Sequence, residues 1–222
     1  ACLLRRVIQS VARQFDMEAT FMSKPFPDQT GSGMHVHASV LGADGQNLFD
    51  DRRPDGQTML GHAVAGLQAT MAEGMAIFAP NLNVFRRFTA NNFTPVTKDW
   101  GENNRSVAFR VPVSSGASRR IEHRISGAEA NPYLVIAAVL AGMHHGIENR
   151  LDPGAVHTGN AGAEIDPNLP LTPWDSLKAL RAATILPRWL GADYPEIYAS
   201  VKEAEFAAFL QSISRREYEW YL

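Results

Sequence analysis

The sequence contains very little cysteine and no long hydrophobic segment. Its single cysteine, Cys2, excludes an internal disulfide framework and fits a reducing compartment. The longest apolar run, residues 133–143, falls well short of the roughly 20 residues that a membrane-spanning helix needs. Neither sign of charge dominates, because the formal net charge is −2. We therefore expect a cytoplasmic protein without a nucleic-acid or membrane partner.

The composition is otherwise typical of a folded domain with a sizeable core. Hydrophobic residues make up 45% of the 222 residues and charged residues 20%. Segments with helical periodicity predict helices over residues 2–15 and 55–78. Asn131 and Pro132 predict the start of a third helix, whose body is apolar all round and is therefore expected to be buried. Three further helices are expected to begin near Thr172, Tyr194 and Ser214.

Strand-like segments are interleaved with these helices without regular strand–helix alternation, which predicts an α+β fold. Strands are predicted for EATFMSKPF, for the HVH segment, for SVAFRVPV and for RRIEHRIS. A hairpin or loop is predicted for LGADGQNLFDD, and a surface crossing for residues 152–170. Residues 81–105 are irregular but carry several aromatic side chains, which favours an ordered functional loop over a linker.

Two histidines follow a glycine-rich turn in TGSGMHVHASV, residues 30–40. In a strand, His35, His37 and Ser39 share one face, because successive side chains point to opposite faces. Two imidazoles and a hydroxyl in this arrangement could hold a metal ion and a phosphate ester. They could equally form a polar strand face that is wetted by solvent.

A second polar strand face carries Arg120, Glu122 and Arg124, whereas His123 alternates to the other side. Such a face could be a surface ion-pair ladder, which contributes little to stability. Guanidinium groups also suit carboxylates and phosphates, and a glutamate and a histidine facing them suit a divalent cation that bridges phosphate oxygens. This combination favours a phosphoryl-transfer site. The preceding strand and loop contribute more arginines: Arg86, Arg87, Arg105 and Arg110.

The order of several motifs closely resembles the C-terminal part of the glutamine synthetase family. These motifs are GSGMHVHAS, NRSVAFRVP, RRIEHRIS, ANPYLVIAAVLAGMHHGI and DPG, and the resemblance covers essentially all 222 residues. It implies the C-terminal part of that family's catalytic domain, in which antiparallel strands form an active-site sheet backed by helices. It also implies that the family's small N-terminal β-grasp domain and first catalytic strands lie upstream. The chain opens within a helical pattern and without an initiator methionine, so we expect it to be part of a longer enzyme.

The resemblance also implies roles for individual residues. His35 and Glu122 would bind a catalytic divalent ion, Mg²⁺ or Mn²⁺, and Arg105 would lie beside the transferred phosphoryl group. The glutamate substrate would contact Gly31, Arg87 and Arg124. The ATP co-substrate would contact His37, Ser39, Arg110 and Arg120. The remaining histidines are expected to have structural or solvated roles: His62, His123, His144, His145 and His157.

The implied reaction is the ATP-dependent ligation of an amine to the γ-carboxylate of glutamate through a γ-glutamyl phosphate. Glutamate, ATP and an amine are thus the expected partners, and the family forms homo-oligomers, including dodecamers. These properties place the chain among the ligases of nitrogen metabolism.

Three departures from the family pattern concern substrate contacts. Thr30 replaces an asparagine of the glutamate pocket, and Ala117 replaces a lysine that contacts the nucleotide. Phe93 falls at about the position of an acidic residue that helps deprotonate ammonium, and no acidic residue occurs between Arg87 and Lys98. An aromatic side chain suits the methylene stem of a larger amine. The loop is therefore similar to the γ-glutamylpolyamine synthetase branch, which uses putrescine or related amines.

Other hypotheses remain open at this point. The enzyme could be a true glutamine synthetase, or it could use ethanolamine or methylamine. A non-catalytic binding or regulatory homologue is also possible, because His35 and Glu122 alone cannot hold two catalytic ions.

Overall fold

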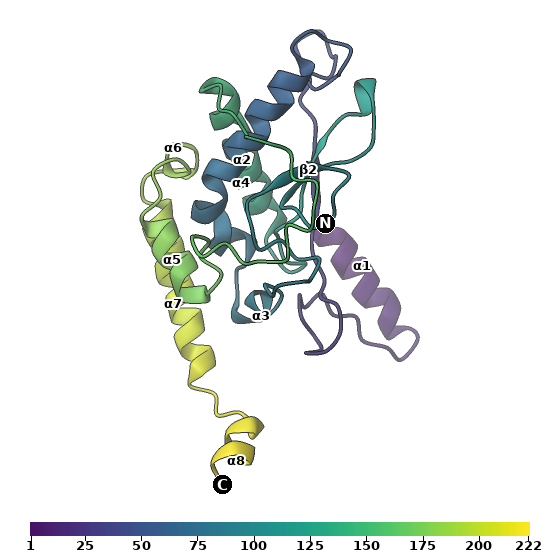
Figure 1. The fold of residues 1–222 in the computed structure, drawn as a ribbon. Helices are drawn as coiled ribbons and strands as arrows, with labels where there is room; N and C mark the ends of the chain where they lie inside the picture. The colour runs from purple at the N-terminus through teal and green to yellow at the C-terminus, as the bar shows by residue number, and fades with distance from the viewer.

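A small mixed sheet lies beside two central helices in a computed structural model that describes residues 1–222 (Figure 1). The strands are β1 (Val36–Ala38), β2 (Trp100–Glu102), β3 (Phe109–Val111) and β4 (Ile121–His123). Their order in the sheet is β1-β4-β3-β2. β4 is antiparallel to both β1 and β3, whereas β2 and β3 are parallel. The predicted α+β class is confirmed, with one parallel pair in a sheet that was expected to be antiparallel.

Eight α-helices complete the fold. The two that form its centre are α2 (Gly56–Phe78) and α4 (Pro132–Glu148). Near the N-terminus is α1 (Cys2–Arg13), and the short α3 (Leu82–Phe85) follows α2. The last part of the chain forms α5 (Pro173–Arg181), α6 (Pro187–Leu190), α7 (Tyr194–Leu210) and α8 (Arg215–Tyr221). Neither α2 nor any other helix is both long enough and apolar enough to cross a membrane.

The predicted long helices and the two arginine-bearing strands are confirmed, but several local predictions are wrong. Residues 18–26 form no strand. The segment 81–105, predicted to be irregular throughout, contains α3 and β2. The Asn81 side chain accepts hydrogen bonds from two N–H groups of α3, so a capping residue and tertiary pairing order this segment.

One apolar core joins the sheet to the central helices. Phe109 and Ile121 from the sheet belong to the same buried cluster as Leu60 from α2 and Val139 from α4. The opposite face of the sheet carries the polar side chains. This division follows from the two-residue repeat of β-strands, and it leaves the polar face free for chemistry.

Burial of α4 is incomplete, which corrects the prediction of a helix buried on every side. Its N-terminus is as predicted, because the Asn131 side chain accepts a hydrogen bond from the Tyr133 N–H and Pro132 occupies the first turn. Val135 and Val139 are buried, but Tyr133, Ile136 and Leu140 are exposed. The reason is that α2 packs on one side of the helix, so the opposite apolar side has no partner within this chain.

A second helical layer lies on the outer side of α2, where α5 and α7 run side by side (Figure 1). Leu177 and Leu180 from α5 and Phe206 from α7 form a smaller buried cluster with Ala76 of α2. The α1 helix projects from the body of the molecule, and none of its residues is buried (Figure 1). The helical stripe of Leu3, Leu4 and their neighbours is therefore solvent-exposed.

Glycines allow α2 and α4 to pack with their backbones almost in contact. A Cβ atom added to Gly66 would lie 2.0 Å from the carbonyl oxygen of Gly142 and 2.5 Å from the nitrogen of Gly146. These neighbours are backbone atoms, which cannot rotate away. The pairing of the two central helices therefore requires glycine at position 66.

We predict that Gly66→Ala lowers the free energy of unfolding by about 3 kcal/mol or more, because overpacking against backbone cannot be relieved by a side-chain rotation. Gly61→Ala is a matched control on the same helix, since its new Cβ would lie 3.5 Å from the Pro153 ring, an ordinary contact. The control should be neutral or stabilise by up to about 1 kcal/mol, owing to the higher helix propensity of alanine. Urea unfolding of both variants measures the difference, and equal stabilities would contradict this account of helix packing.

Candidate functional site

The centre of the polar sheet face is the carboxylate of Glu122, a side chain that is only 3% exposed. Its Oε1 accepts a hydrogen bond from Arg124 Nη1 at 2.8 Å and lies 2.9 Å from His35 Nδ1. Its Oε2 accepts a hydrogen bond from Arg110 Nη1 at 2.7 Å. The surface ion-pair ladder is thus ruled out for Glu122, because the carboxylate is buried and bound from three directions.

The charges around Glu122 favour its ionised form. Burial by itself raises the pKa of the carboxyl group, but hydrogen bonds from Arg110 and Arg124 and the charge of Arg124 outweigh that effect. The net result is a pKa below the ordinary value. Burial and the positive charge of Arg124 lower the pKa of His35, although Glu122 acts in the opposite direction. Glu122 is therefore a carboxylate and His35 a largely neutral imidazole near pH 7.

Strand register brings these residues together. Glu122 in β4 lies directly opposite His37 in β1 and Arg110 in β3. Residues paired in this way project from the same face of the sheet, and His35 reaches that face because it lies two residues before His37. A shift of one residue in either register would replace Glu122 by a neighbour that faces the core.

The predicted nucleotide-side residues lie along the edge of this face. Arg120 Nε lies 3.3 Å from His37 Nδ1, and Arg120 also donates to the Ser118 carbonyl oxygen. Ser39 follows directly after β1 and is exposed. Arg105 is exposed as well, and its carbonyl oxygen accepts a hydrogen bond from Arg124 Nη2 at 2.9 Å. Arg120 and His37 thus lie together on this face, and Arg105 is joined to Arg124 through its backbone.

Arg87 is buried beneath the glycine-rich turn without forming an ion pair. The residue is 3% exposed, and its Nη1 donates to the Ile125 carbonyl oxygen at 3.2 Å. Burial lowers the pKa of Arg87 to about 10, partly offset by the more distant charge of Glu129. Burying a cation without a carboxylate partner is costly, and such a group is a strong candidate for binding an anion from outside the chain.

The glycines of the turn permit this placement of Arg87. A Cβ atom at Gly33 would lie 2.8 Å from Arg87 Nη2. One at Gly31 would lie 2.6 Å from the Ser23 carbonyl oxygen and 3.0 Å from Arg87 Cγ. The glycines of GSG are therefore explained by close approach of the Arg87 side chain and, at Gly31, of the Ser23 backbone, which the sequence pattern alone did not indicate.

Positive charge is in excess at the site, and several donors there lack acceptors. The Nε–H groups of Arg87, Arg110 and Arg124 are all buried without a hydrogen-bond partner. Unpartnered donors of this kind are uncommon in folded proteins, and an anionic ligand with several oxygens could accept from them. The cluster is thus suited to carboxylate and phosphate groups.

Two donor side chains of the site could hold a divalent metal ion. The 2.9 Å between His35 Nδ1 and Glu122 Oε1 matches the distance between neighbouring ligand atoms of an octahedral ion with bonds of about 2.1 Å, which is about 3 Å. This chain contains no group of three or more histidine, cysteine, aspartate or glutamate side chains placed to hold one ion. Water and phosphate oxygens commonly complete the coordination of Mg²⁺.

Asn103 is a site residue that sequence reasoning missed. Its Oδ1 accepts a hydrogen bond from Arg110 Nη2 at 2.6 Å, so it fixes the second arm of the guanidinium that binds Glu122. Asn103 has φ 48°, a conformation that asparagine tolerates better than most residues. The asparagine pair in GENNR was the available signal, but only the tertiary structure shows that Arg110 is the partner.

His123 is a structural residue, as predicted. Its ring packs against Phe78, with ring centroids 4.5 Å apart, and against Phe109 at 5.6 Å. Among the other histidines, His62 Nδ1 lies 2.7 Å from the Leu151 carbonyl oxygen and His157 lies 3.6 Å from Asp99. His144 and His145 lie on α4, near Glu148 and Asn149 respectively.

Comparisons with known proteins identify the class to which this fold and site belong. The family described as "Glutamine synthetase, catalytic domain" matches residues 1–221. Gamma-glutamylputrescine synthetase PuuA of Escherichia coli K12 is 36% identical over 222 residues, which is 100% of this chain and 47% of that protein. Glutamate–isopropylamine ligase of a Pseudomonas species is 38% identical over 163 residues, covering 72% of this chain and 36% of that protein.

Solved structures of GmaS are similar to this chain in fold and in sequence. A GmaS/ADP complex is similar with a TM-score of 0.85 and 32% identity, covering 99% of this chain and 52% of the GmaS chain. Apo GmaS without ligand has a TM-score of 0.84. The chain belongs to the glutamine synthetase family. It spans about half the length of most of the relatives that it matches.

The buried His123 should make stability depend on pH. Burial, assisted by the positive charge that His35 gains on protonation, lowers the pKa of His123 to about 3, whereas an unfolded histidine titrates near 6.5. Between these values the unfolded chain binds more protons, so stability falls as pH decreases from about 6.5 toward 3. The expected contribution is a loss of about 2 kcal/mol at pH 5 relative to neutral pH.

Urea unfolding of wild type and His123→Leu between pH 5 and 7 measures this contribution. Leucine cannot be protonated, so the variant should show a flatter dependence of unfolding free energy on pH. Parallel pH profiles for the two proteins would show that His123 does not carry the effect.

Proposed function

We propose that this chain forms the glutamate- and nucleotide-binding part of an ATP-dependent ligase that joins an amine to the γ-carboxylate of glutamate. The observation that carries the proposal is the arginine cluster around buried Glu122, with Arg87 buried nearby and unpaired. A site of this kind stabilises anionic substrates and the charge that moves during phosphoryl transfer. Membership of the glutamine synthetase family supports the reaction type.

The proposed reaction has two balanced steps. In the first, a γ-carboxylate oxygen of glutamate attacks the γ-phosphorus of ATP, and ADP leaves, which produces γ-glutamyl phosphate. In the second, the amine nitrogen attacks the acyl carbon and loses a proton, and phosphate departs with the oxygen that came from glutamate. The residues of this chain would position the reactants and neutralise charge, since phosphoryl transfer requires little covalent chemistry from the protein.

Glutamate would bind beneath the glycine-rich turn. Arg87 and Arg124 offer unpartnered buried Nε–H groups to a carboxylate, and Gly31 leaves the space that Arg87 occupies. A carboxylate would provide the counter-charge that Arg87 lacks within the chain. These contacts support the proposed role of Gly31, Arg87 and Arg124 as the substrate-binding residues.

ATP and its metal ion would lie on the open sheet face. We assign Mg²⁺ or Mn²⁺ to His35 and Glu122, whose ligand atoms are suitably spaced. A divalent ion bound there would neutralise negative charge on phosphate oxygens. His37, Ser39, Arg110 and Arg120 would contact the nucleotide, and Arg105 would lie beside the transferred phosphoryl group.

The amine is proposed to be a polyamine such as putrescine. Phe93 is 67% exposed in the loop after Arg87, and no carboxylate occurs between Arg87 and Lys98 to bind ammonium. The relatives named after putrescine and isopropylamine act on amines larger than ammonia. A diamine could place its stem against Phe93 or Trp100 and its distal ammonium near Asp99 or Glu102.

The same proposal places the enzyme in the cytoplasm as a homo-oligomer. Exposed apolar side chains on α1 and on the outer side of α4 support self-association, because large unpartnered apolar surfaces commonly mark interfaces.

We predict that the complete gene product prefers putrescine to ammonium by at least about tenfold in kcat/KM. The reason is that losing a charge-assisted contact to ammonium costs about 1.5–3 kcal/mol. Phosphate release measured with ammonium, ethanolamine and putrescine tests the preference. Phe93→Glu should shift it toward ammonium.

Phe15→Glu is a control with the same substitution at an equally exposed phenylalanine, 67% in both cases. It should leave the ratio of kcat/KM for putrescine to kcat/KM for ammonium unchanged. If ammonium were the best substrate of the unmodified enzyme, the protein would be a glutamine synthetase and the argument from the loop would be wrong.

A further inference from the structure

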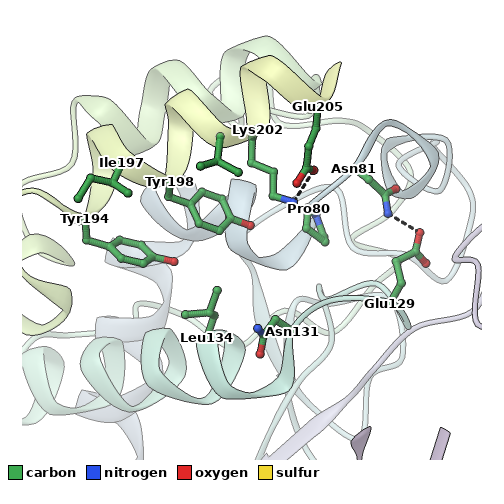
Figure 2. Close-up of a pocket in the computed structure, with 11 residues that line it drawn as sticks. Pro80, Asn81, Glu129, Asn131, Leu134, Tyr194, Ile197, Tyr198, Lys202 and Glu205 are labelled. Atoms are coloured by element: carbon green, nitrogen blue, oxygen red, sulfur yellow. Dashed lines mark hydrogen bonds and ion pairs between the residues drawn. The ribbon is translucent and has the colours of Figure 1, made fainter. Parts of the chain in front are cut away.

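A second cavity lies away from the Glu122 site, between α4, α7 and the segment that joins α2 to α3 (Figure 2). Its volume is about 460 Å³, and none of the proposed substrate, nucleotide or metal residues lines it. Its walls are apolar at one end and charged at the other, and α7 contributes side chains to both ends (Figure 2). The cavity therefore has the polarity of a site for an amphipathic small molecule.

Two tyrosines and a leucine form the apolar end. The rings of Tyr194 and Tyr198 stack with centroids 5.5 Å apart and planes inclined by 28°. Leu134 of α4 faces them across the cavity (Figure 2). The Tyr198 hydroxyl donates to the Ala76 carbonyl oxygen, so this ring is fixed in position. Such a wall suits a hydrocarbon chain.

Two carboxylates and one ammonium group form the charged end. Glu205 Oε2 accepts a hydrogen bond from Lys202 Nζ at 2.7 Å. Glu129 Oε1 accepts one from Asn81 Nδ2 at 2.8 Å, whereas its Oε2 is buried without a partner. The sum of these charges is negative, and a buried carboxylate oxygen without a donor favours binding of a cation.

The start of α4 does not reverse this preference for a cation. Its first residue, Pro132, has no N–H group, and the Asn131 side chain already accepts from the Tyr133 N–H. Few free donors are therefore available to an anion at this end of the cavity.

A neighbouring cavity of about 350 Å³ shares Asn81, Glu129 and Glu205 with the cavity of about 460 Å³. Its other walls include Leu82 and Phe206. The two carboxylates thus stand between two apolar compartments, and either compartment can accept the hydrocarbon part of a ligand whose cationic group meets the carboxylates.

We propose that this cavity is a binding site for an alkylammonium ligand, whose charged group meets Glu205 and Glu129 and whose hydrocarbon chain lies along Tyr194, Tyr198 and Leu134. The site is separate from the amine position in the proposed ligase reaction. Binding here requires neither ATP nor glutamate, so the inference does not rest on the proposed function.

The experiment is a titration of the complete gene product with n-hexylamine, followed by ligand-observed NMR in the absence of ATP and glutamate. 1-Hexanol is the uncharged control and should bind at least tenfold more weakly. Glu205→Gln should weaken hexylamine binding at least fivefold. Lys202→Met should strengthen it severalfold, because it removes the cation that competes for Glu205 while keeping an apolar stem.

Two further variants distinguish binding in this cavity from binding elsewhere on the protein. Glu219 is a matched control, because its side chain is 52% exposed, against 51% for Glu205, and it also pairs with a basic side chain. Glu219→Gln should have no effect on hexylamine binding. Phe93→Glu alters the proposed amine position of the reaction and should leave the effect of Glu205→Gln on hexylamine binding unchanged. Equal binding of hexanol would overturn the proposal. It would also be overturned if Glu205→Gln and Lys202→Met did not act in opposite directions, or if Phe93→Glu rather than Glu205→Gln altered binding.

Discussion

The buried carboxylate of Glu122 is the interaction on which the candidate site depends. It binds Arg110 and Arg124 directly and lies beside His35, so three segments of the chain converge on two oxygen atoms. An ionised carboxylate in a nearly dry environment is stable only with such partners. The pairing of β4 with β1 and β3 places them there, and the apolar face of the same strands joins the main core. Folding of the core and assembly of the site are therefore consequences of one strand register.

The surroundings of Arg87 differ from those of Glu122. Glu122 has its own cationic partners, but Arg87 is buried with only a backbone carbonyl as a hydrogen-bond acceptor. The close approach of Gly31 and Gly33 keeps it in this position. A buried cation that lacks a counter-ion destabilises the unliganded protein and stabilises an anionic complex. This arrangement agrees with the proposed substrates, a dicarboxylic amino acid and a nucleoside triphosphate.

Local patterns in the sequence predicted much of this arrangement, and tertiary contacts account for the remainder. The two-residue repeat placed His35 and His37 on one strand face and Glu122 on the polar face of another strand, and apolar periodicity located α2 and the start of α4. Short β2 and the Asn103 contact to Arg110 depend on the pairing of β2 with β3, and the cavity beside Tyr194 depends on segments far apart in the chain. Single-sequence periodicity does not encode either kind of pairing. The exposed side of α4 was not predicted for a related reason. An apolar sequence indicates that a helix packs against partners, but it does not indicate which partners this chain supplies.

The most direct test of this account compares wild type with Arg87→Met, a substitution that keeps a long side chain and removes its charge. Calorimetry would measure glutamate binding to the complete gene product, and urea unfolding would measure its stability, with Arg86→Met at the neighbouring exposed position as a control. We expect glutamate affinity to fall at least about tenfold, as loss of a charge-assisted contact implies, while the unfolding free energy stays constant or rises. Unchanged affinity, together with a loss of about 3 kcal/mol or more in stability, would instead make Arg87 a structural residue and contradict the account.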